Sequence, residues 1–457
     1  MSAARNISRF IRKLVGNTRR LEAAGSGRAA GITSAGPMNP EVMAQGSVVR
    51  ARARGSFYNN GLIRNAVENW IAECVRSGVM AKPTLPYLIP FWKAWCRVAD
   101  HNGITNFDGL SAQVLRSVIV DGEAFVQIIT TPDGPSLVLL QPEQVAEDLT
   151  VTLPVGGYIV QGIEFNANGQ RVAYHVRPYD PTQVFPTWSQ PVRIDAADIL
   201  HVFQPLMPGQ VRGLSWLAPV LLSANELDAA TDALIVAAKV AAMHCVILTD
   251  PNGDAADPYA ATPEPMQPGS VIRAPLGTDV KVSSPQQFTS AAPLLRQITL
   301  QIAAGLGLPE HLVNGDLSNA NYSSLRAGMI PFRARVEQFQ YTVLCPQFFD
   351  KVWARFIAEA VLSGRIDAPD YESNPENYVS DWIFPAFVQV DPLKVVQADA
   401  AEVAAGFASR SQKVAERGWD IEDIDAQRAA DAAREKIPSV DPFETVAANQ
   451  QEKPAND

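Results

Sequence analysis

The residues in this chain best suited to chemistry are two carboxylates, Asp228 and Asp232, which lie four positions apart in a segment with helical periodicity. Residues at that spacing share a helix face, and carboxylate oxygens are ligands for divalent cations, so the pair could hold a metal ion. The same spacing also fits a solvated helix face, because both residues and Lys239 lie away from the apolar stripe of the segment. Both interpretations stay open at this point.

Other catalytic motifs are absent from the sequence. It contains no GxxxxGK[ST] phosphate loop, no HExxH and no GxSxG, and its five histidines are scattered singly. GLGLP at 305–309 follows a helical segment, so we interpret it as helix termination. The four cysteines form no CxxC pair, which predicts buried thiols in a reducing compartment. We therefore predict a scaffold without catalysis, metal or cofactor; the alternative is a cytosolic enzyme of unrecognised class with a site near Asp228 and Asp232.

Charge is spread unevenly along the chain. Residues 1–64 hold ten Arg and one Lys against two Glu, a net charge of +9, whereas the whole chain carries −10, which leaves −19 for residues 65–457. Such a basic arm suits phosphate, an acidic partner or a neighbouring subunit, and it also fits a solvated tail. Ile7, Phe10, Ile11 and Leu14 share a helical face that would suit a membrane surface. No segment has the roughly eighteen uncharged apolar residues of a spanning helix, nor does the N-terminus resemble a secretory signal, so we expect no membrane partner.

The pattern of elements predicts helices around a sheet. We expect residues 15–55 to be poorly ordered, and helices from Phe57 to Val75 and over 110–120. Residues 118–205 predict a mixed sheet, with a hairpin at Asn168-Gly169 because both residues tolerate positive φ.

The remaining segments are mostly helical. An amphipathic helix is expected over 214–243, a turn-rich excursion after it, a hairpin across Leu276-Gly277, and a helix over 293–305. A longer helix should follow, with one apolar seam and a kink at Pro346. The seam comprises Leu325, Met329, Phe332, Val336, Phe339 and Val343. It could pack within the chain or against a neighbouring subunit.

A polar loop with few charged residues, GDLSNANYSSLRAG at 315–328, separates two of these helical segments. Its side chains are mostly small hydroxyls and amides around one aromatic residue, Tyr322. Ser323 or Ser324 is a favourable N-cap for the helix that follows.

Two runs carry a resemblance to a known family. ILHVFQPLMPGQVRGLSWLAPVL (199–221) and LRQITLQIAAGLGLPEHLVNGDLSNANYSSLRAG (295–328) resemble the portal proteins of tailed bacteriophages, of the phage lambda type. DGEAF (121–125), AYHVRP (173–178) and ASRSQKVAERGWDIEDI (408–424) follow that family in the same order. The similarity extends over roughly residues 45–435.

The resemblance implies an α+β portal fold, with a mixed α/β wing, a helical stem, a small clip and an α-helical crown, assembled as a ring. It implies a phage head–tail connector: a dodecameric channel at one capsid vertex for DNA packaging and genome ejection. The implied partners are double-stranded DNA without sequence specificity, the large terminase subunit, a head-completion or adaptor protein, and the major capsid protein or scaffold. The implied location is the virion, after assembly in the host cytoplasm.

Element order maps these parts onto the chain. The expected parts are a basic flexible arm (1–55), wing (56–213), stem helix (214–245), clip (246–290), stem helix (291–313), tunnel loop (314–324), long kinked helix and wing return (325–394), crown helices (395–437) and polar tail (438–457).

The resemblance also places the polar loop at the channel constriction. The residues implied to line the DNA channel are Ser318, Asn319, Asn321, Tyr322, Ser323 and Ser324. A neutral lining suits a sliding polyanion, because each lysine placed on a phosphate would add a counterion-release term and strengthen binding. The acidic body would act in the same sense by repelling DNA.

Overall fold

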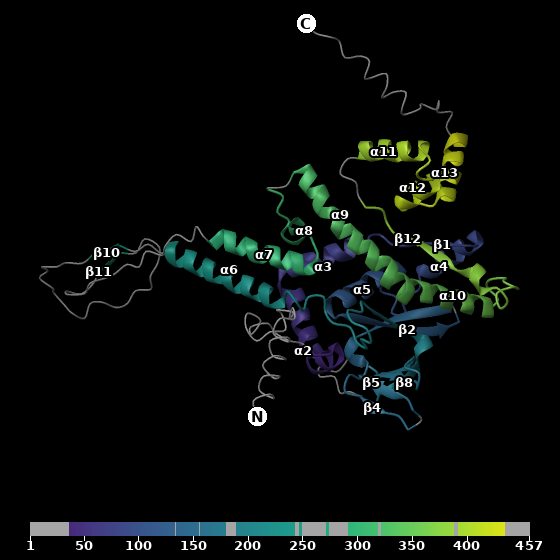
Figure 1. Cartoon of the computed structure of the whole chain (residues 1–457), viewed down its shortest axis with the longest axis horizontal. Coiled ribbons are helices and arrows are strands. Elements are labelled where there is room, and N and C mark those ends of the chain that lie inside the picture. Colours follow the sequence, from purple (N-terminus) through teal and green to yellow (C-terminus); the bar gives the residue numbers. More distant parts are fainter. Residues whose placement is uncertain are drawn as a thin grey trace, which may run out of the picture.

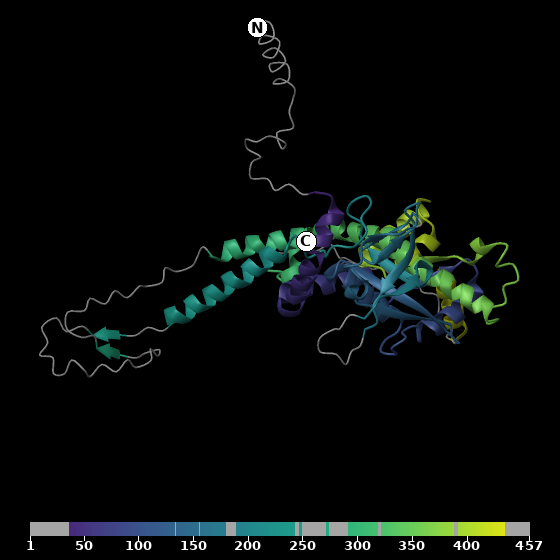
Figure 2. The same ribbon diagram turned by 90° about the horizontal axis from the view of Figure 1, so that it is seen from below.

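The computed structural model describes residues 36–132, 134–154, 156–179, 189–242, 246–248, 271–273, 291–318, 321–387 and 392–434. An α/β body carries a pair of helices, α6 and α7, that project away from it (Figure 1), and the view turned by 90° shows the same projection (Figure 2). The α+β class predicted from the sequence is confirmed. The basic arm up to residue 35 lies outside the described residues.

The sheets of the body are antiparallel, so the predicted mixed sheet is wrong in its pairing. One has the order β3-β2-β9, formed by Gly134–Leu140, Glu123–Thr131 and Ile199–Phe203. The other runs β4 to β8 in sequence order: Val151–Thr152, Tyr158–Val160, Ile163–Phe165, Arg171–Val176 and Val192–Asp195. Antiparallel neighbours need only short turns. The hairpin predicted at Asn168-Gly169 is confirmed between β6 and β7, with Gly169 at φ 77°.

A third, two-stranded sheet joins the two halves of the sequence. Strand β1, Met80–Pro83, pairs antiparallel with β12, Ser380–Ile383. Short 3-10 turns punctuate the body at Pro86–Leu88, Pro142–Gln144, Ala196–Asp198 and Pro375–Tyr378.

The N-terminal helices correct a second prediction. Helix α2 spans Met38–Asn59, although residues 15–55 were expected to be poorly ordered. Its Gly-, Ala- and Arg-rich sequence hides the buried positions, one of which is an arginine, Arg50. Helix α3, Gly61–Cys74, follows at once because the side chain of Asn60 accepts a hydrogen bond from Ile63 N and caps it. Helices α4, Ile89–Cys96, and α5, Phe107–Val120, complete this part.

The projecting pair consists of α6, Leu221–Ala242, and α7, Ala291–Leu306. The predicted start at residue 214 is too early, because α6 is preceded by turns over residues 216–220. Beyond α6, the short strands β10, Val246–Leu248, and β11, Val271–Arg273, pair in parallel. The hairpin predicted at Leu276-Gly277 falls outside the described residues. Among the helices of the described ranges, none is long and apolar enough to cross a membrane.

A long helical rod follows the short helix α8, Glu310–Asn314. It comprises α9, Tyr322–Phe339, a π-helical stretch, Gln340–Phe349, and α10, Asp350–Leu362. The irregularity expected at Pro346 takes the form of this π-helical stretch, since proline donates no backbone hydrogen bond. The apolar seam is buried from Phe332 to Val343, so it packs within the chain.

Three C-terminal helices complete the described chain: α11, Pro392–Ala404, α12, Arg410–Glu416, and α13, Ile421–Arg434. Surface ion pairs connect them, among them Arg410 with Asp425 at 2.5 Å and Arg417 with Asp399 at 2.7 Å. None of their side chains is buried.

The main core lies where α3, α4, α5 and the helical rod meet. Its densest part is aromatic: the Trp92 ring centroid lies 5.2 Å from that of Phe107 and 5.0 Å from that of Trp353. A second, smaller core around Phe125 and Tyr174 lies between the two larger sheets.

The buried seam yields a stability prediction. Phe332 is 1% exposed, and its ring meets that of Trp70 edge-on at 5.0 Å. We expect Phe332→Ala to lower the free energy of unfolding by about 3–5 kcal/mol, because it leaves a cavity in the core. Ile330→Ala, two positions away and 62% exposed, should cost under about 1 kcal/mol. Guanidinium unfolding of both variants checks this, and equal losses would contradict packing within the chain.

Candidate functional site

The polar loop between α8 and α9 begins on a fixed anchor. Asn69 Nδ2 donates to Leu312 O at 2.6 Å, and Asn65 Nδ2 donates to Leu312 O and Val313 O, both at 2.9 Å. The last carbonyls of a helix have no partner within the helix, so these two asparagines of α3 satisfy the end of α8. Gly315, at φ 72°, then turns the chain out of the helix.

The loop itself is built from short side-chain-to-backbone hydrogen bonds. Asp316 N donates to Asn314 Oδ1, and Ser318 N donates to Asp316 Oδ1, each at 2.9 Å. At the far end, Ser324 N donates to Asn321 Oδ1 at 2.8 Å, and Asn321 N donates to Ser324 Oγ at 3.0 Å. This reciprocal pair is a capping box, which fixes where α9 starts.

The predicted N-cap is therefore wrong by two or three residues. Asn321 caps the helix, and Ser323 and Ser324 lie in its first turn, because an asparagine side chain reaches the free N–H groups as well as a serine does. Of the predicted channel-lining residues, Ser318, Asn321, Ser323 and Ser324 are exposed.

The two other predicted lining residues are Tyr322 and Asn319. Tyr322 opens α9, and Asn319 lies outside the described residues. Asp316 is the loop's acidic group, and hydrogen bonds from Ser318 lower its pKa. What the loop offers chemically is exposed hydroxyl and amide groups.

Aromatic packing joins the helices on both sides of the loop. Trp70 of α3 donates from Nε1 to Leu306 O at 3.0 Å, at the end of α7. The same indole meets Phe332 of α9 and Trp216, which precedes α6, in edge-on contacts at 5.0 and 5.2 Å. One residue of α3 thus contacts the bases of both projecting helices and the rod that follows the loop.

The projecting helices leave apolar side chains uncovered. Leu222 and Val236 of α6 and Leu294 of α7 are all exposed. Where exposed apolar side chains gather on a soluble protein, they mark a contact surface for another protein. Near the base of the pair, Arg296 forms an ion pair with Glu310 at 3.1 Å.

The carboxylates Asp228 and Asp232 do not come together with other ligands. Both are exposed, and Asn60 Nδ2 donates to Asp228 Oδ2 at 2.8 Å. In the part of the chain that the structure describes, no group of three or more His, Cys, Asp or Glu residues could hold a metal ion. The arrangement fits the solvated helix face, the second of the two sequence interpretations.

Sequence reasoning missed a buried ionic cluster in the body, centred on Glu123 of β2. Arg212 Nε donates to both Glu123 carboxylate oxygens, at 2.8 and 3.0 Å, and Gly213 N donates to Oε2 at 2.8 Å. His201 Nε2 also lies 3.0 Å from Oε2. Both Glu123 and Arg212 are fully buried. A buried charge is tolerated only when it is paired and hydrogen-bonded, and this one is.

The protonation states in this cluster follow from its contacts. Burial, the largest single effect, would raise the pKa of Glu123, but the charge and hydrogen bonds of Arg212 and His201 together outweigh it, and the pKa is lowered. Burial lowers the pKa of His201 to about 4, against the opposing effect of Glu123. Arg171 lies 3.4 Å from His201 Nδ1 and can only donate. At neutral pH, His201 is therefore a neutral imidazole whose Nε2–H donates to Glu123.

The cluster also attaches α2 to the body. Arg50, buried on α2, lies 2.6 Å from Glu147 and 3.5 Å from Glu123. One helical turn later, Arg54 contacts Asp121 at 2.6 Å and Glu143 at 2.9 Å. The available sequence signals were the DGEAF run and the two arginines four positions apart, but neither indicates burial.

Comparison with known proteins adds the following. Residues 26–340 match the family described as phage portal protein, lambda family. The chain is 24% identical over 334 residues to the probable portal protein of Halomonas phage phiHAP-1, and 23% identical over 318 residues to portal protein B of Escherichia phage lambda. It is also 23% identical over 321 residues to the portal protein of Escherichia phage N15.

These alignments cover 69%, 62% and 62% of this chain. They cover 64%, 59% and 60% of the relatives, so the chain spans about three fifths of the length of the curated proteins it matches.

Two solved structures are similar at low identity. One is a chain in the virion of a native gene transfer agent particle, with a TM-score of 0.41, 18% identity, and coverage of 87% of this chain and 97% of that one. The other is a chain in the neck of the native particle computed with C12 symmetry, with a TM-score of 0.42, 17% identity, and coverage of 86% and 98%.

The buried cluster yields a second stability prediction. Glu123→Gln removes the charge that balances Arg212, so we expect it to lower the free energy of unfolding by about 3–5 kcal/mol. The matched control is Glu68→Gln, which breaks a partly exposed ion pair with Arg116 and should cost under about 1 kcal/mol. Chemical denaturation measures both. A loss for Glu123→Gln no larger than for Glu68→Gln would show that the cluster does not hold the body together.

Proposed function

Because this chain belongs to the lambda family of phage portal proteins, we propose that it is a portal protein, a ring-forming head–tail connector without catalysis. Double-stranded DNA would pass through the ring during packaging and ejection, without sequence-specific contacts. The observation that carries the proposal is the family match over residues 26–340, which includes α2 to α9, the projecting helices and the polar loop.

The parts of a portal are assigned by element order. The body with its sheets would be the wing, α6 and α7 the stem, residues 246–290 the clip, and α11 to α13 the crown. The proposed partners are the large terminase subunit, a head-completion or adaptor protein, and the major capsid protein or scaffold. The proposed location is the virion, at one capsid vertex, after assembly in the host cytoplasm.

Ring formation is supported by the uncovered side chains of the projecting helices. Leu222, Val236 and Leu294 face solvent in a single chain, and the burial of apolar surface is the main favourable term in association. A head-to-tail contact between identical subunits closes into a ring when its rotation permits. We propose a ring of about twelve subunits with this surface in the contact.

The polar loop is the proposed channel lining. It is anchored at one end by Asn65 and Asn69 and at the other by the Asn321 capping box, while Ser318, Ser323 and Ser324 remain exposed. Exposed neutral groups exchange hydrogen bonds with water and DNA without releasing counterions, so they add no salt-dependent contribution to the binding of phosphates. This combination suits a constriction through which DNA slides.

Native mass spectrometry of the purified chain tests the portal proposal. We expect a closed ring of about twelve subunits, and Leu294→Glu should reduce it to smaller species because it places a charge in the apolar contact. The matched control is Leu362→Glu, an exposed leucine at the end of α10 away from α6 and α7, which should leave the ring intact. A wild-type chain that stays monomeric at every concentration would refute the proposal.

The channel role of the loop makes a separate prediction. Ser323→Lys should strengthen the binding of duplex DNA to the assembled ring by roughly tenfold or more at low salt. The reason is that each subunit of the ring would then contribute a lysine, and several lysines would contact phosphates. The gain should disappear as salt rises. Ser323→Gln, long but neutral, is the control and should bind like the wild type. Fluorescence anisotropy over a salt series measures this; identical binding by the Lys and Gln variants would place Ser323 away from DNA.

A further inference from the structure

The connection between β9 and α6 has an apolar tip that faces solvent. Leu206 and Met207, in the run QPLMPGQ (204–210), are 55% and 59% exposed. The backbone of this loop is nevertheless fixed, because Gln210 Oε1 accepts hydrogen bonds from Leu206 N at 2.7 Å and Met207 N at 3.4 Å. Gln210 is buried, and its Nε2 donates to Arg212 O at 2.8 Å. A buried amide thus holds two large apolar side chains out in solvent.

The start of α2 is attached to the same loop. Asn39 Nδ2 donates to Gly209 O at 2.8 Å, and Val211 N donates to Asn39 Oδ1 at 2.9 Å. Met43 lies one helical turn after Asn39 on the same face of α2 and is 46% exposed. Exposed apolar side chains on a fixed backbone mark a contact surface, and methionine adapts its shape to a partner. We define the apolar patch as Met43, Leu206 and Met207.

Position selects residues 1–35 as the occupant of the apolar patch. Gly36 is three positions before Asn39, so residues 1–35 join the described chain beside the loop. Residues 435–457 follow α13, and Figure 1 shows α13 on the other side of the helical rod from α2. The connection after α6 begins at the far end of the projecting pair in both Figure 1 and Figure 2.

The sequence of this segment fits an apolar surface. Its apolar residues recur at spacings of three and four, which predicts a helix with one apolar face. An amphipathic helix binds by laying that face on an apolar surface. The apolar residues are Ile7, Phe10, Ile11 and Leu14, and the basic residues that fall elsewhere around the helix are Arg9, Arg12 and Lys13.

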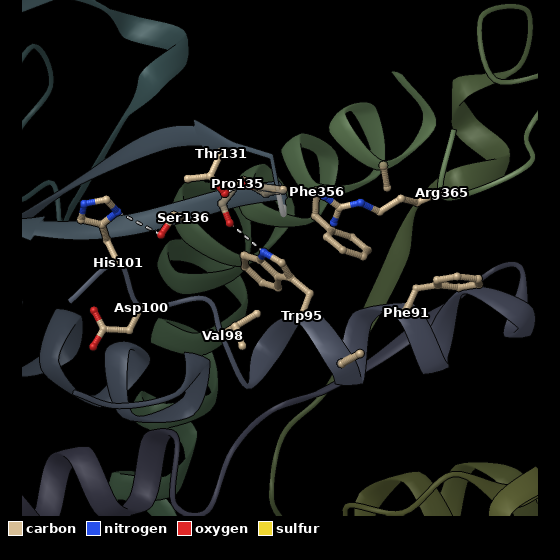
Figure 3. A pocket seen from close by; sticks show the side chains of 13 residues that line it. Phe91, Trp95, Val98, Asp100, His101, Thr131, Pro135, Ser136, Phe356 and Arg365 are labelled. Atoms are coloured by element: carbon tan, nitrogen blue, oxygen red, sulfur yellow. Dashed lines mark hydrogen bonds between the residues drawn. The ribbon is translucent and has the colours of Figure 1, made fainter. Parts of the chain in front are cut away.

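A cavity of about 510 Å³ between α4, the β2–β3 turn and the end of α10 is a competing site (Figure 3). Its polar side chains already bond within its own wall: Trp95 Nε1 donates to Pro135 O at 2.7 Å, and Ser136 Oγ lies 3.4 Å from His101 Nδ1. In Figure 1, α4 and α10 lie apart from the start of α2, where residues 1–35 join the described chain. The point of attachment therefore favours the apolar patch over this cavity.

We propose that residues 1–35 fold back onto their own chain and place Phe10 and its apolar neighbours on the apolar patch. Twenty-one residues separate Leu14 from Gly36, so the chain is long enough to turn back. A tethered segment meets its site at an effective concentration on the order of millimolar, so a patch of three side chains is sufficient. The cost of closing the connecting loop grows only slowly with its length.

Disulfide formation in the full-length chain tests the contact. We expect the two thiols of Phe10→Cys with Met207→Cys to link at least roughly tenfold faster under mild oxidation than those of Phe10→Cys with Val48→Cys, because only the first pair is held together. Val48 is the matched control: it is 48% exposed on α2, nine positions from Asn39 and on the opposite face. The single variants control for the native cysteines. Mixing isotope-labelled and unlabelled chains before oxidation shows by peptide mapping whether the link lies within one chain.

Hydrogen exchange gives a second measurement without introduced thiols. Exchange in residues 5–14 should be roughly tenfold faster in Met207→Glu than in the wild type, because a carboxylate on the apolar patch releases the segment. Val48→Glu should exchange like the wild type. Phe10→Ala lies outside the body and should also speed this exchange, so the test does not depend on the folding of a body variant.

Three outcomes would overturn the proposal. The first is equal linking of the two thiol pairs, and the second is a link that joins different chains. The third is exchange in residues 5–14 that slows only when phosphatidylglycerol vesicles are added, which would assign the apolar face to a membrane surface. Both measurements are repeated in the Leu294→Glu background, where ring contacts are weakened. The proposal therefore stands or fails separately from ring formation.

Discussion

The fold depends on one buried charge. A carboxylate inside a protein is tolerated only if every lone pair finds a donor, and Glu123 meets this condition with Arg212, His201 and Gly213 N at once. Two glycines make the arrangement possible: a Cβ on Gly122 would lie 2.3 Å from Leu214 C, and one on Gly213 would lie 2.1 Å from Gly122 O. The segment that leads into α6 is thereby fixed against β2. Because Arg50 reaches the same carboxylate, α2 is fixed there as well.

The position of the polar loop follows from this arrangement. With the segment before α6 held in place, Trp216 is presented to Trp70, and Trp70 in turn contacts Leu306 O and Phe332. The asparagines of α3 then fix the end of α8 on the same helix. Anchors on both sides of the loop therefore originate in α3, so the exposed residues between them sit at a set position relative to the projecting helices. A rigid scaffold carrying a short polar loop is the arrangement that a functional loop needs.

The spacing of apolar residues predicted the elements that are held by burial of apolar side chains. It missed the elements that are held by ion pairs and hydrogen bonds. The seam of α9 and the hairpin at Gly169 followed from spacing and turn chemistry, and both are confirmed. Helix α2 was missed because one of its buried anchors is Arg50, and a scan for apolar side chains assigns an arginine to the surface. The capping box at Asn321 was misplaced because several adjacent residues are acceptable caps, and only the backbone geometry selects one. The lining role of the loop remains a prediction, since a single chain does not define a channel.

Two regions of this chain lack a core of their own. The projecting helices expose leucine and valine, and α11 to α13 bury no side chain, although Phe407 and Trp419 lie among them. A helical unit of this size buries too little apolar surface to be stable alone. Contacts with the rest of the chain or with other subunits must therefore bury its apolar side chains. In the proposed ring, neighbouring subunits would cover the projecting helices. Ion pairs such as Arg410–Asp425 are exposed and contribute little. These helices are thus oriented by weak polar contacts within one chain, and their apolar side chains remain available for contacts that the assembly makes.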